Sequence, residues 1–298
     1  MRIGFLADLH YGIDGWVDHR VDRFLEKKVG PAQCDLLLIA GDVAEMADLA
    51  GEDLGDNHRR LLERARAVVA CPIGFCAGNH DIWSSDPAAD SWRIYHEVLP
   101  EAAVQTGTTC LDVENLTIGD LTVVGCYGHF DYSLHAPDLE IGGRLVTEDD
   151  YRRQTPPGYS APVWMDGQSI HWAFDDPRAC AVICDAAMMR LESALTTTGR
   201  KKARPRRQIV LLTHGIPRRE LNGHGDSRDA LSLFLQAFSG TNRLEAMVRR
   251  AVAAGASVLS VSGHTHKSVP KLSLDGADYL NVGGTYGMPR LVIEELGA

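Results

Sequence analysis

Ten polar residues of types that bind metals or transfer protons directly follow apolar segments of the chain. They lie in five short stretches, ADLH (residues 7–10), GDVAE (41–45), GNHD (78–81), THGIP (213–217) and GHTH (263–266). Carboxylate oxygens suit hard cations and imidazole suits transition metals, so a mixed set favours divalent metals that handle water and phosphate oxygens. The ten residues are Asp8, His10, Asp42, Glu45, Asn79, His80, Asp81, His214, His264 and His266.

Spacing within two of these stretches supports a shared site. Asp8 and His10 are two residues apart just beyond an apolar run, and so are His264 and His266. Alternate side chains of an extended backbone point to the same side, so each pair can face one cluster. Three of the stretches begin with glycine, which permits tight turns and close backbone approach.

Strands and helices must alternate to place these stretches together. In the first third of the chain, apolar runs at 2–7, 35–40 and 72–77 predict strands, and helical spacing predicts helices at 18–29 and 57–70. Each of the three runs ends in one of the polar stretches. In open α/β sheets, functional groups gather where strands end in loops, so the site is expected there.

The rest of the chain repeats this order. A helix is expected at about 89–99, before a proline. Further strands are expected at 121–125, 208–212 and 257–261, and further helices at 177–195 and 242–254. Two or three strands close the chain. Such apolar runs would be buried by one domain, residues 1–298, built of two sheets covered by helices.

Residues 127–173 differ from the rest because they show little periodicity and contain PDLEIGG and TPPGYSAP. We expect a loop-rich insertion here, and it could shape the substrate site. Its side chains are expected to form either a small aromatic core or a substrate wall. Those side chains are Phe130, Asp131, Tyr132, Trp164, Asp166 and Trp172.

Composition narrows the functional classes. The chain has 298 residues, is 45% hydrophobic and has a formal net charge of −10, which argues against general affinity for nucleic acid. Residues 200–207 (RKKARPRR) are a basic exception that we interpret as a solvated loop. No apolar run is long enough to span a membrane and no signal peptide is recognisable, so a cytoplasmic location is expected. The seven cysteines include no CxxC pair and are expected to be buried thiols.

The five stretches, in this order, resemble the motifs of the calcineurin-like metallophosphoesterase family. They span residues 7 to 266. The resemblance implies an α/β fold, a four-layer αββα sandwich of two mixed β-sheets flanked by helices. It also implies two metal ions, divalent or trivalent, for which the mixed ligands admit Mn, Fe, Zn or Ni.

The resemblance also implies a role for each residue. One metal would be bound by Asp8, His10 and His266, the other by Asn79, His214 and His264, with Asp42 bridging them. The catalytic residues would be His80, which lies beside the metals, Glu45, which orients His80, and Asp81. Relatives have Glu or Asp at the position of Asp81. Arg218, Arg219 and His224 are weaker candidates for contacts with the substrate, and a solvated loop is the simpler interpretation for the two arginines.

The implied activity is hydrolysis of a small-molecule phosphomonoester or phosphodiester by a hydroxide that the two metals share. Two alternatives stay open. One is a phosphodiesterase of nucleotides or nucleic acid, which would use residues 200–207. The other is a non-catalytic protein-interaction scaffold on the same fold. The sequence leaves the natural substrate, the native metals and the oligomeric state open.

Overall fold

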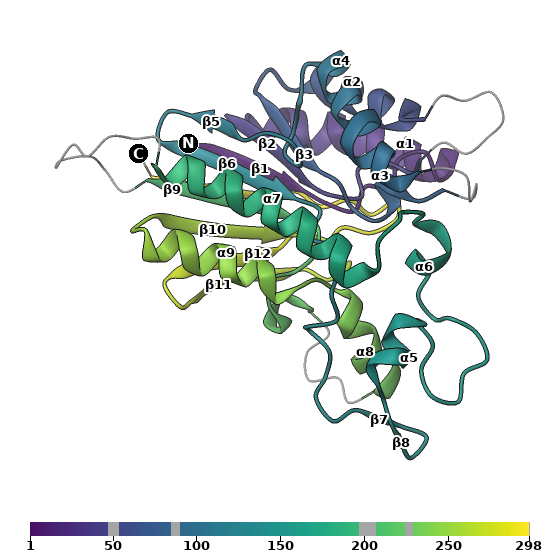
Figure 1. The fold of residues 1–298 in the computed structure, drawn as a ribbon. Helices are drawn as coiled ribbons and strands as arrows, with labels where there is room; N and C mark the ends of the chain where they lie inside the picture. Colours follow the sequence, from purple (N-terminus) through teal and green to yellow (C-terminus); the bar gives the residue numbers. More distant parts are fainter. Residues whose placement is uncertain (47–53, 85–89, 197–206, 224–228, 298) are drawn as a thin grey trace.

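Two mixed β-sheets pack face to face in the computed structural model (Figure 1), which describes residues 1–46, 54–84, 90–196, 207–223 and 229–297. The first sheet has the strand order β13-β1-β2-β3-β4, in which β1 to β4 run parallel and β13 antiparallel to β1. The strands are β1 (Arg2–Leu6), β2 (Leu36–Ala40), β3 (Ile73–Cys76), β4 (Thr109–Cys110) and β13 (Val292–Glu295).

The second sheet has the order β11-β12-β10-β9-β6-β5. Its four inner strands run parallel, and β5 and β11 are antiparallel edge strands. The strands are β5 (Leu116–Ile118), β6 (Leu121–Cys126), β9 (Gln208–Thr213), β10 (Ser257–Ser262), β11 (Val269–Leu274) and β12 (Ala277–Asn281). Every strand predicted from an apolar run is present.

The apolar side chains between the sheets form one core. Ile3 and Phe5 of β1 face Val210 and Leu212 of β9 in this cluster. Successive side chains of a strand point to opposite faces, so the alternate residues of β1 and β2 pack against helices instead. Burial on both faces explains why β2 reads as a continuous apolar run, LLLIA, all of it buried.

Helices cover the outer face of each sheet. The helices α1, α2 and α4 lie over the first sheet, and α7 and α9 over the second (Figure 1). This arrangement confirms the four-layer αββα sandwich. The helices are α1 (Gly15–Phe24), α2 (Asp56–Val68), α4 (Leu99–Thr106), α7 (Asp176–Thr196) and α9 (Asn242–Ala253).

The helix expected to end at Leu99 was predicted too short. The chain stays helical from α3 (Ser91–Arg93) through a π-helical turn, η4 (Ile94–Val98), into α4. Proline lacks a backbone N–H and crowds the preceding turn of an α-helix. The wider π-helical turn directly before Leu99 and Pro100 lets the helix continue past the proline.

The insertion at 127–173 is loop-rich, as expected, but carries short elements. These are a two-stranded ribbon of β7 (Glu140–Ile141) and β8 (Arg144–Leu145), and the helices α5 (Glu148–Arg152) and α6 (Asp166–Ser169). Phe130, Tyr132 and Tyr151 pack with Phe234 and Phe238, which belong to the helical segments α8 (Ala230–Leu235) and η6 (Gln236–Phe238). The expected aromatic core therefore exists.

The cysteines and the absence of a membrane span were also predicted from the sequence. All seven cysteines are free thiols, and six of them are buried. None of the helices in the described ranges is both long and apolar enough to cross a bilayer. The predictions about His224 and about residues 200–206 of the basic segment lie outside the described residues.

Candidate metal centre

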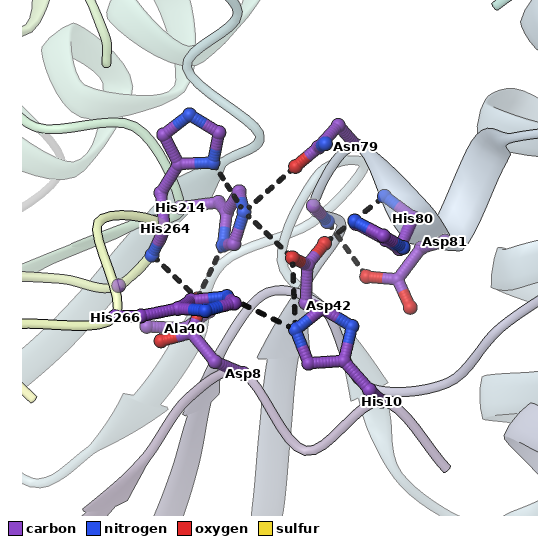
Figure 2. A network of polar contacts seen from close by, with 12 residues as sticks. Asp8, His10, Ala40, Asp42, Asn79, His80, Asp81, His214, His264 and His266 are labelled. Atoms are coloured by element: carbon purple, nitrogen blue, oxygen red, sulfur yellow. Dashed lines mark hydrogen bonds and ion pairs between the residues drawn. The ribbon is translucent and has the colours of Figure 1, made fainter. Parts of the chain in front are cut away.

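The predicted metal ligands meet at one edge of the two sheets. Asp8 and His10 follow β1, Asp42 follows β2, Asn79 follows β3, His214 follows β9, and His264 and His266 follow β10. Figure 2 shows their side chains pointing toward one another from these strand ends. All seven are buried except His264 and His266, which are partly exposed.

A first group of donors consists of Asp8, His10, Asp42 and His266. One ligand atom from each lies within 4.8 Å of the others. Nε2 of His10 is 3.1 Å from Nε2 of His266 and 3.6 Å from Oδ2 of Asp42. Oδ1 of Asp8 is 3.7 Å from Nε2 of His266. This is the predicted ligand set of the first metal together with the predicted bridge.

A second group surrounds Nε2 of His214. This nitrogen is 3.1 Å from Oδ1 of Asn79, 3.0 Å from Nδ1 of His264 and 3.3 Å from Oδ2 of Asp42. The same oxygen of Asp42 therefore approaches an imidazole of each group (Figure 2). Asp42 therefore lies between the two donor groups.

Hydrogen bonds on the outer side of the imidazoles decide which nitrogen faces inward. Nδ1 of His10 donates to the carboxylate of Glu45, and Nδ1 of His214 donates to the carbonyl of Ala40. Nε2 of His264 donates to the carbonyl of Phe238. In a neutral imidazole the second nitrogen then carries a lone pair, so these rings present acceptors to the centre.

The inward nitrogens lie close to one another. Nε2 of His214 and Nδ1 of His264 are both acceptors in neutral rings, so their 3.0 Å contact is favourable only with a proton or a cation between them. Nε2 of His10 is likewise an acceptor and lies 3.1 Å from Nε2 of His266. Oδ2 of Asp8 is buried and accepts no hydrogen bond within the described residues. These donors fit metal ions, whose binding would satisfy the nitrogens and the orphan oxygen together.

Backbone conformation singles out the same residues. Asp8, His10, Asp42, His264 and His266 have φ between 47° and 72°, the left-handed region that non-glycine residues rarely adopt. Residues in such conformations cost free energy and cluster at functional sites, where the surrounding structure holds them in place. Five of the seven predicted ligands are held in this way.

The family model for calcineurin-like phosphoesterases matches residues 1–268. The chain belongs to this family. The phosphoesterase is therefore a metal-dependent hydrolase of phosphoric esters, in a family that uses two metals, and it carries donor groups that could hold them. No curated protein sequence matches the chain significantly.

Solved structures with a similar fold come from distant proteins. A dimetal phosphatase from Danio rerio is 11% identical, with 99% of this chain and 92% of that chain covered and a TM-score of 0.47. GAP50, the anchor in the inner membrane complex of Plasmodium, is 9% identical, with coverages of 95% and 71% and a TM-score of 0.45. A 5'-nucleotidase from Candida albicans is 11% identical, with coverages of 96% and 45% and a TM-score of 0.43.

Glu45 of the phosphoesterase joins the metal centre to His80. Its carboxylate accepts from Nδ1 of His10 at 3.0 Å and from Nδ1 of His80 at 2.9 Å. Nε2 of His80 lies 3.5 Å from the hydroxyl of Tyr286. His10, Glu45 and His80 are also close enough together to form a metal-binding group. Their proximity is explained by the hydrogen bonds of both imidazoles to the carboxylate of Glu45.

Replacing Glu45 with Gln is expected to lower turnover about 10- to 100-fold, the usual cost of losing a group that orients a metal ligand or catalytic side chain. The amide cannot accept from both imidazoles with a carboxylate's charge. Turnover measured at saturating metal checks this, with Glu97→Gln as the matched control because Glu97 pairs with Arg93 at the surface. An unchanged rate in Glu45→Gln would remove the proposed orienting role.

Asp81 lies beside the centre but faces away from it. Its Oδ1 accepts from the backbone N–H of Ala44 at 2.9 Å and from Nε2 of His58 at 2.7 Å. Its Oδ2 accepts from the N–H of Val43 at 3.2 Å and of Gly78 at 2.6 Å. Asp81 therefore ties the loop after β2 to the loop after β3. This geometry favours a positioning role over the catalytic role expected from the sequence.

Burial and neighbouring charges raise the pKa of some imidazoles at the centre and lower that of others. Burial opposes charge on His80, but Asp42 and the hydrogen bond to Glu45 outweigh it and raise the pKa of His80 to about 9. Asp42 likewise outweighs the burial of His214 and raises its pKa to about 9. Burial, with the repulsion of His10, lowers the pKa of His266 to about 4. Metal binding at His214 therefore competes with a proton, whereas His266 is already neutral.

Two aromatic residues at the centre were missed from the sequence. Trp83 stacks on His80 with 3.7 Å between ring centroids, and Tyr286 stacks on His10 at 4.1 Å. Trp83 comes two residues after GNHD. Tyr286 follows the end of β12 in a glycine-rich loop, GGTYG, so a search of strand ends that included aromatic residues and extended past residue 266 would have found it.

A cavity of about 390 Å³ opens beside the centre. Asp42, His80 and His266 contribute its polar floor, and the insertion supplies part of its wall. The apolar and aromatic wall consists of Trp83, Val163, Trp164, Met165, Leu235 and Tyr286.

Other candidate residues lie elsewhere. Phe130 and Tyr132 belong to the aromatic core. Of the residues expected in the wall, Trp164 lines the cavity, and Asp131, Asp166 and Trp172 do not. Arg218 pairs with Glu220, and the guanidinium of Arg219 donates to backbone carbonyls of the insertion. Neither arginine lines the cavity.

Proposed function

We propose that this phosphoesterase hydrolyses a small-molecule phosphomonoester or phosphodiester at two metal ions held by Asp8, His10, Asp42, Asn79, His214, His264 and His266. The observation that carries the proposal is the position of Asp42. One oxygen of this carboxylate lies 3.6 Å from His10 and 3.3 Å from His214, the central imidazoles of the two donor groups. A single carboxylate can therefore serve both ions.

Metal ions held by these residues would supply Lewis acidity for the phosphoryl oxygens and would lower the pKa of bound water toward neutral. The side chains provide the rest. His80 faces the cavity beside the donor groups, and its Nδ1 is held by Glu45, so its Nε2 is available to stabilise or protonate the leaving oxygen. Trp83 stacks on its ring and limits its rotation.

The cavity supports a small substrate with an organic alcohol part. Its volume of about 390 Å³ is in the range of small-molecule sites. The wall offers aromatic and aliphatic surface, with Asn222, Ser232 and Gln236 as neutral hydrogen-bonding groups. The net charge of −10 adds no general attraction for nucleic acid.

Removal of metal provides the direct test. Chelator-treated protein is expected to lose hydrolysis of p-nitrophenyl phosphate and bis(p-nitrophenyl) phosphate, and Mn²⁺, Zn²⁺, Fe²⁺ or Ni²⁺ should restore it, because the donors accept several first-row metals. Metal analysis of the purified protein is expected to find two ions per chain. A protein with no activity toward either ester under any of these metals would support the scaffold alternative instead.

Nucleic acid provides the second comparison. The proposal predicts no salt-sensitive binding of DNA or RNA oligonucleotides in a fluorescence anisotropy titration. Binding that weakens steeply with salt, together with cleavage of the oligonucleotide, would favour the nucleic-acid phosphodiesterase alternative.

A further inference from the structure

Asp166 is a buried carboxylate of the insertion that reaches the metal centre. It is 1% exposed and opens the short helix α6. Its Oδ1 accepts from Nδ2 of Asn79 at 3.0 Å and from Nε1 of Trp83 at 2.7 Å. One oxygen atom thus contacts a predicted metal ligand and the indole that covers His80.

The contact with Asn79 decides which end of the amide faces the metals. A carboxylate oxygen only accepts hydrogen bonds, so the NH₂ group of Asn79 must point toward Asp166. Its Oδ1 then points inward, 3.1 Å from Nε2 of His214. The reversed amide would present an NH₂ group to the centre, and that group cannot bind a cation.

The contact with Trp83 fixes the aromatic wall at the same point. The indole lies 3.7 Å from the ring of His80, with 29° between the two planes. Because its N–H is bound to Asp166, the indole cannot turn away without leaving a buried carboxylate short of a donor.

The backbone around Asp166 is itself anchored. The carbonyl of Ser169 accepts from the N–H of Ser84 at 2.8 Å, and the side chain of Gln154 accepts from the N–H of Gly167 at 2.8 Å. These bonds fix α6 to the loop after β3 and to the end of α5. Asp166 is therefore presented by a braced segment, as a positioning group must be.

We propose that Asp166 is a positioning residue that sets the amide of Asn79 for metal binding and locks Trp83 over His80. The insertion thereby becomes part of the metal centre as well as of the cavity wall. The proposal rests on the proposed function in one respect, because it requires Asn79 to be a metal ligand.

Metal affinity is the first readout. Calorimetric titration of the metal-free protein with Mn²⁺ is expected to show two sites, and Asp166→Ala should weaken one of them about 10- to 100-fold, as loss of a ligand's hydrogen-bond partner usually does. Asp166→Asn keeps an acceptor oxygen and should lie closer to wild type. Asp176→Asn is the matched control, because Asp176 holds the insertion through His129 and Tyr132 and should leave both sites unchanged.

A double variant separates positioning from a general structural effect. Asn79→Asp supplies two equivalent oxygens, so the orientation of residue 79 no longer matters, but its carboxylate then repels that of Asp166. Adding Asp166→Ala to Asn79→Asp removes this repulsion and is expected to leave Mn²⁺ affinity unchanged or higher, whereas the same change in the Asn79 background weakens one site. An equal loss in both backgrounds would overturn the positioning role.

The indole N–H of Trp83 gives a readout that needs no metal. Its ¹H–¹⁵N resonance, assigned by its absence in Trp83→Phe, is expected to shift in Asp166→Ala and to stay in place in Asp176→Asn. Wild-type Mn²⁺ affinity and an unmoved resonance in Asp166→Ala would overturn the proposal and leave the proposed function intact. A wild-type protein that binds none of Mn²⁺, Zn²⁺, Fe²⁺ and Ni²⁺ would overturn both, and that result is visible without any variant.

Discussion

Asp42→Asn is expected to lose metal and activity together. In the wild-type protein, Oδ1 of Asp42 accepts a hydrogen bond from the backbone N–H of His80 at 3.0 Å. The amide oxygen of Asn can still accept this bond, but Asn lacks the negative charge that two cations would share. Metals contribute several kcal/mol of transition-state stabilisation, so turnover should fall by at least about 1,000-fold. Metal content after gel filtration and turnover at a fixed Mn²⁺ concentration are the two measurements.

Asn is a better replacement than Ala at this position. Asp42 has φ of 47°, and Asn tolerates the left-handed conformation that Ala resists. Asp138→Asn is the matched control, because Asp138 is exposed and has φ of 52°. An Asp42→Asn protein with two metals and full activity would contradict the bridging carboxylate.

His80→Ala is expected to slow turnover while leaving both metals bound. Nδ1 of His80 binds Glu45, and its ring lines the cavity and stacks on Trp83, so its loss removes a proton donor or charge from the leaving oxygen. General acid catalysis contributes about 10²- to 10⁴-fold, and kcat should fall within that range. Steady-state kinetics with parallel metal analysis checks the prediction.

Leaving-group chemistry sharpens this test. Esters of acidic phenols need little protonation, so His80→Ala should cost least on p-nitrophenyl phosphate and most on an alkyl phosphate. His19→Ala is the control because His19 is an exposed residue of α1. Loss of both metals in His80→Ala would reject the assigned role and make His80 part of the metal-binding set.

The sheets and the candidate metal-binding residues could be predicted because both follow from the burial of the strands on two faces. Strands buried on two faces read as uninterrupted apolar runs, as in β2, and the loops after them must hold the polar groups. The spacing of Asp8 and His10 suggested that both face one cluster, and the family motifs assigned their roles. The extended backbone assumed for these two residues, and for His264 and His266, was wrong, because all four have left-handed φ angles. The ordered motifs were sufficient for the fold because residues far apart in sequence had to meet at one edge.

The contacts between side chains were less predictable. Asp81 sits in the GNHD motif, yet its carboxylate serves backbone N–H groups because the loops after β2 and β3 cross there. Asp166 was considered only as part of an aromatic core or a substrate wall, because no periodic pattern indicates that the insertion folds back onto Asn79. Tyr286, which stacks on His10, is not one of the carboxylate, imidazole or amide groups that were collected from the strand ends, so it was passed over.

The two donor groups each draw from both sheets. Asp8 and His10 belong to the first sheet and His266 to the second, while Asn79 belongs to the first and His214 to the second. A bound ion in either position is therefore a cross-link between the two halves of the sandwich. Free metal at 100 times its dissociation constant would add about 2.7 kcal/mol to the free energy of unfolding per site. Bound metal ions would therefore also stabilise the packing of the two sheets against each other at this edge.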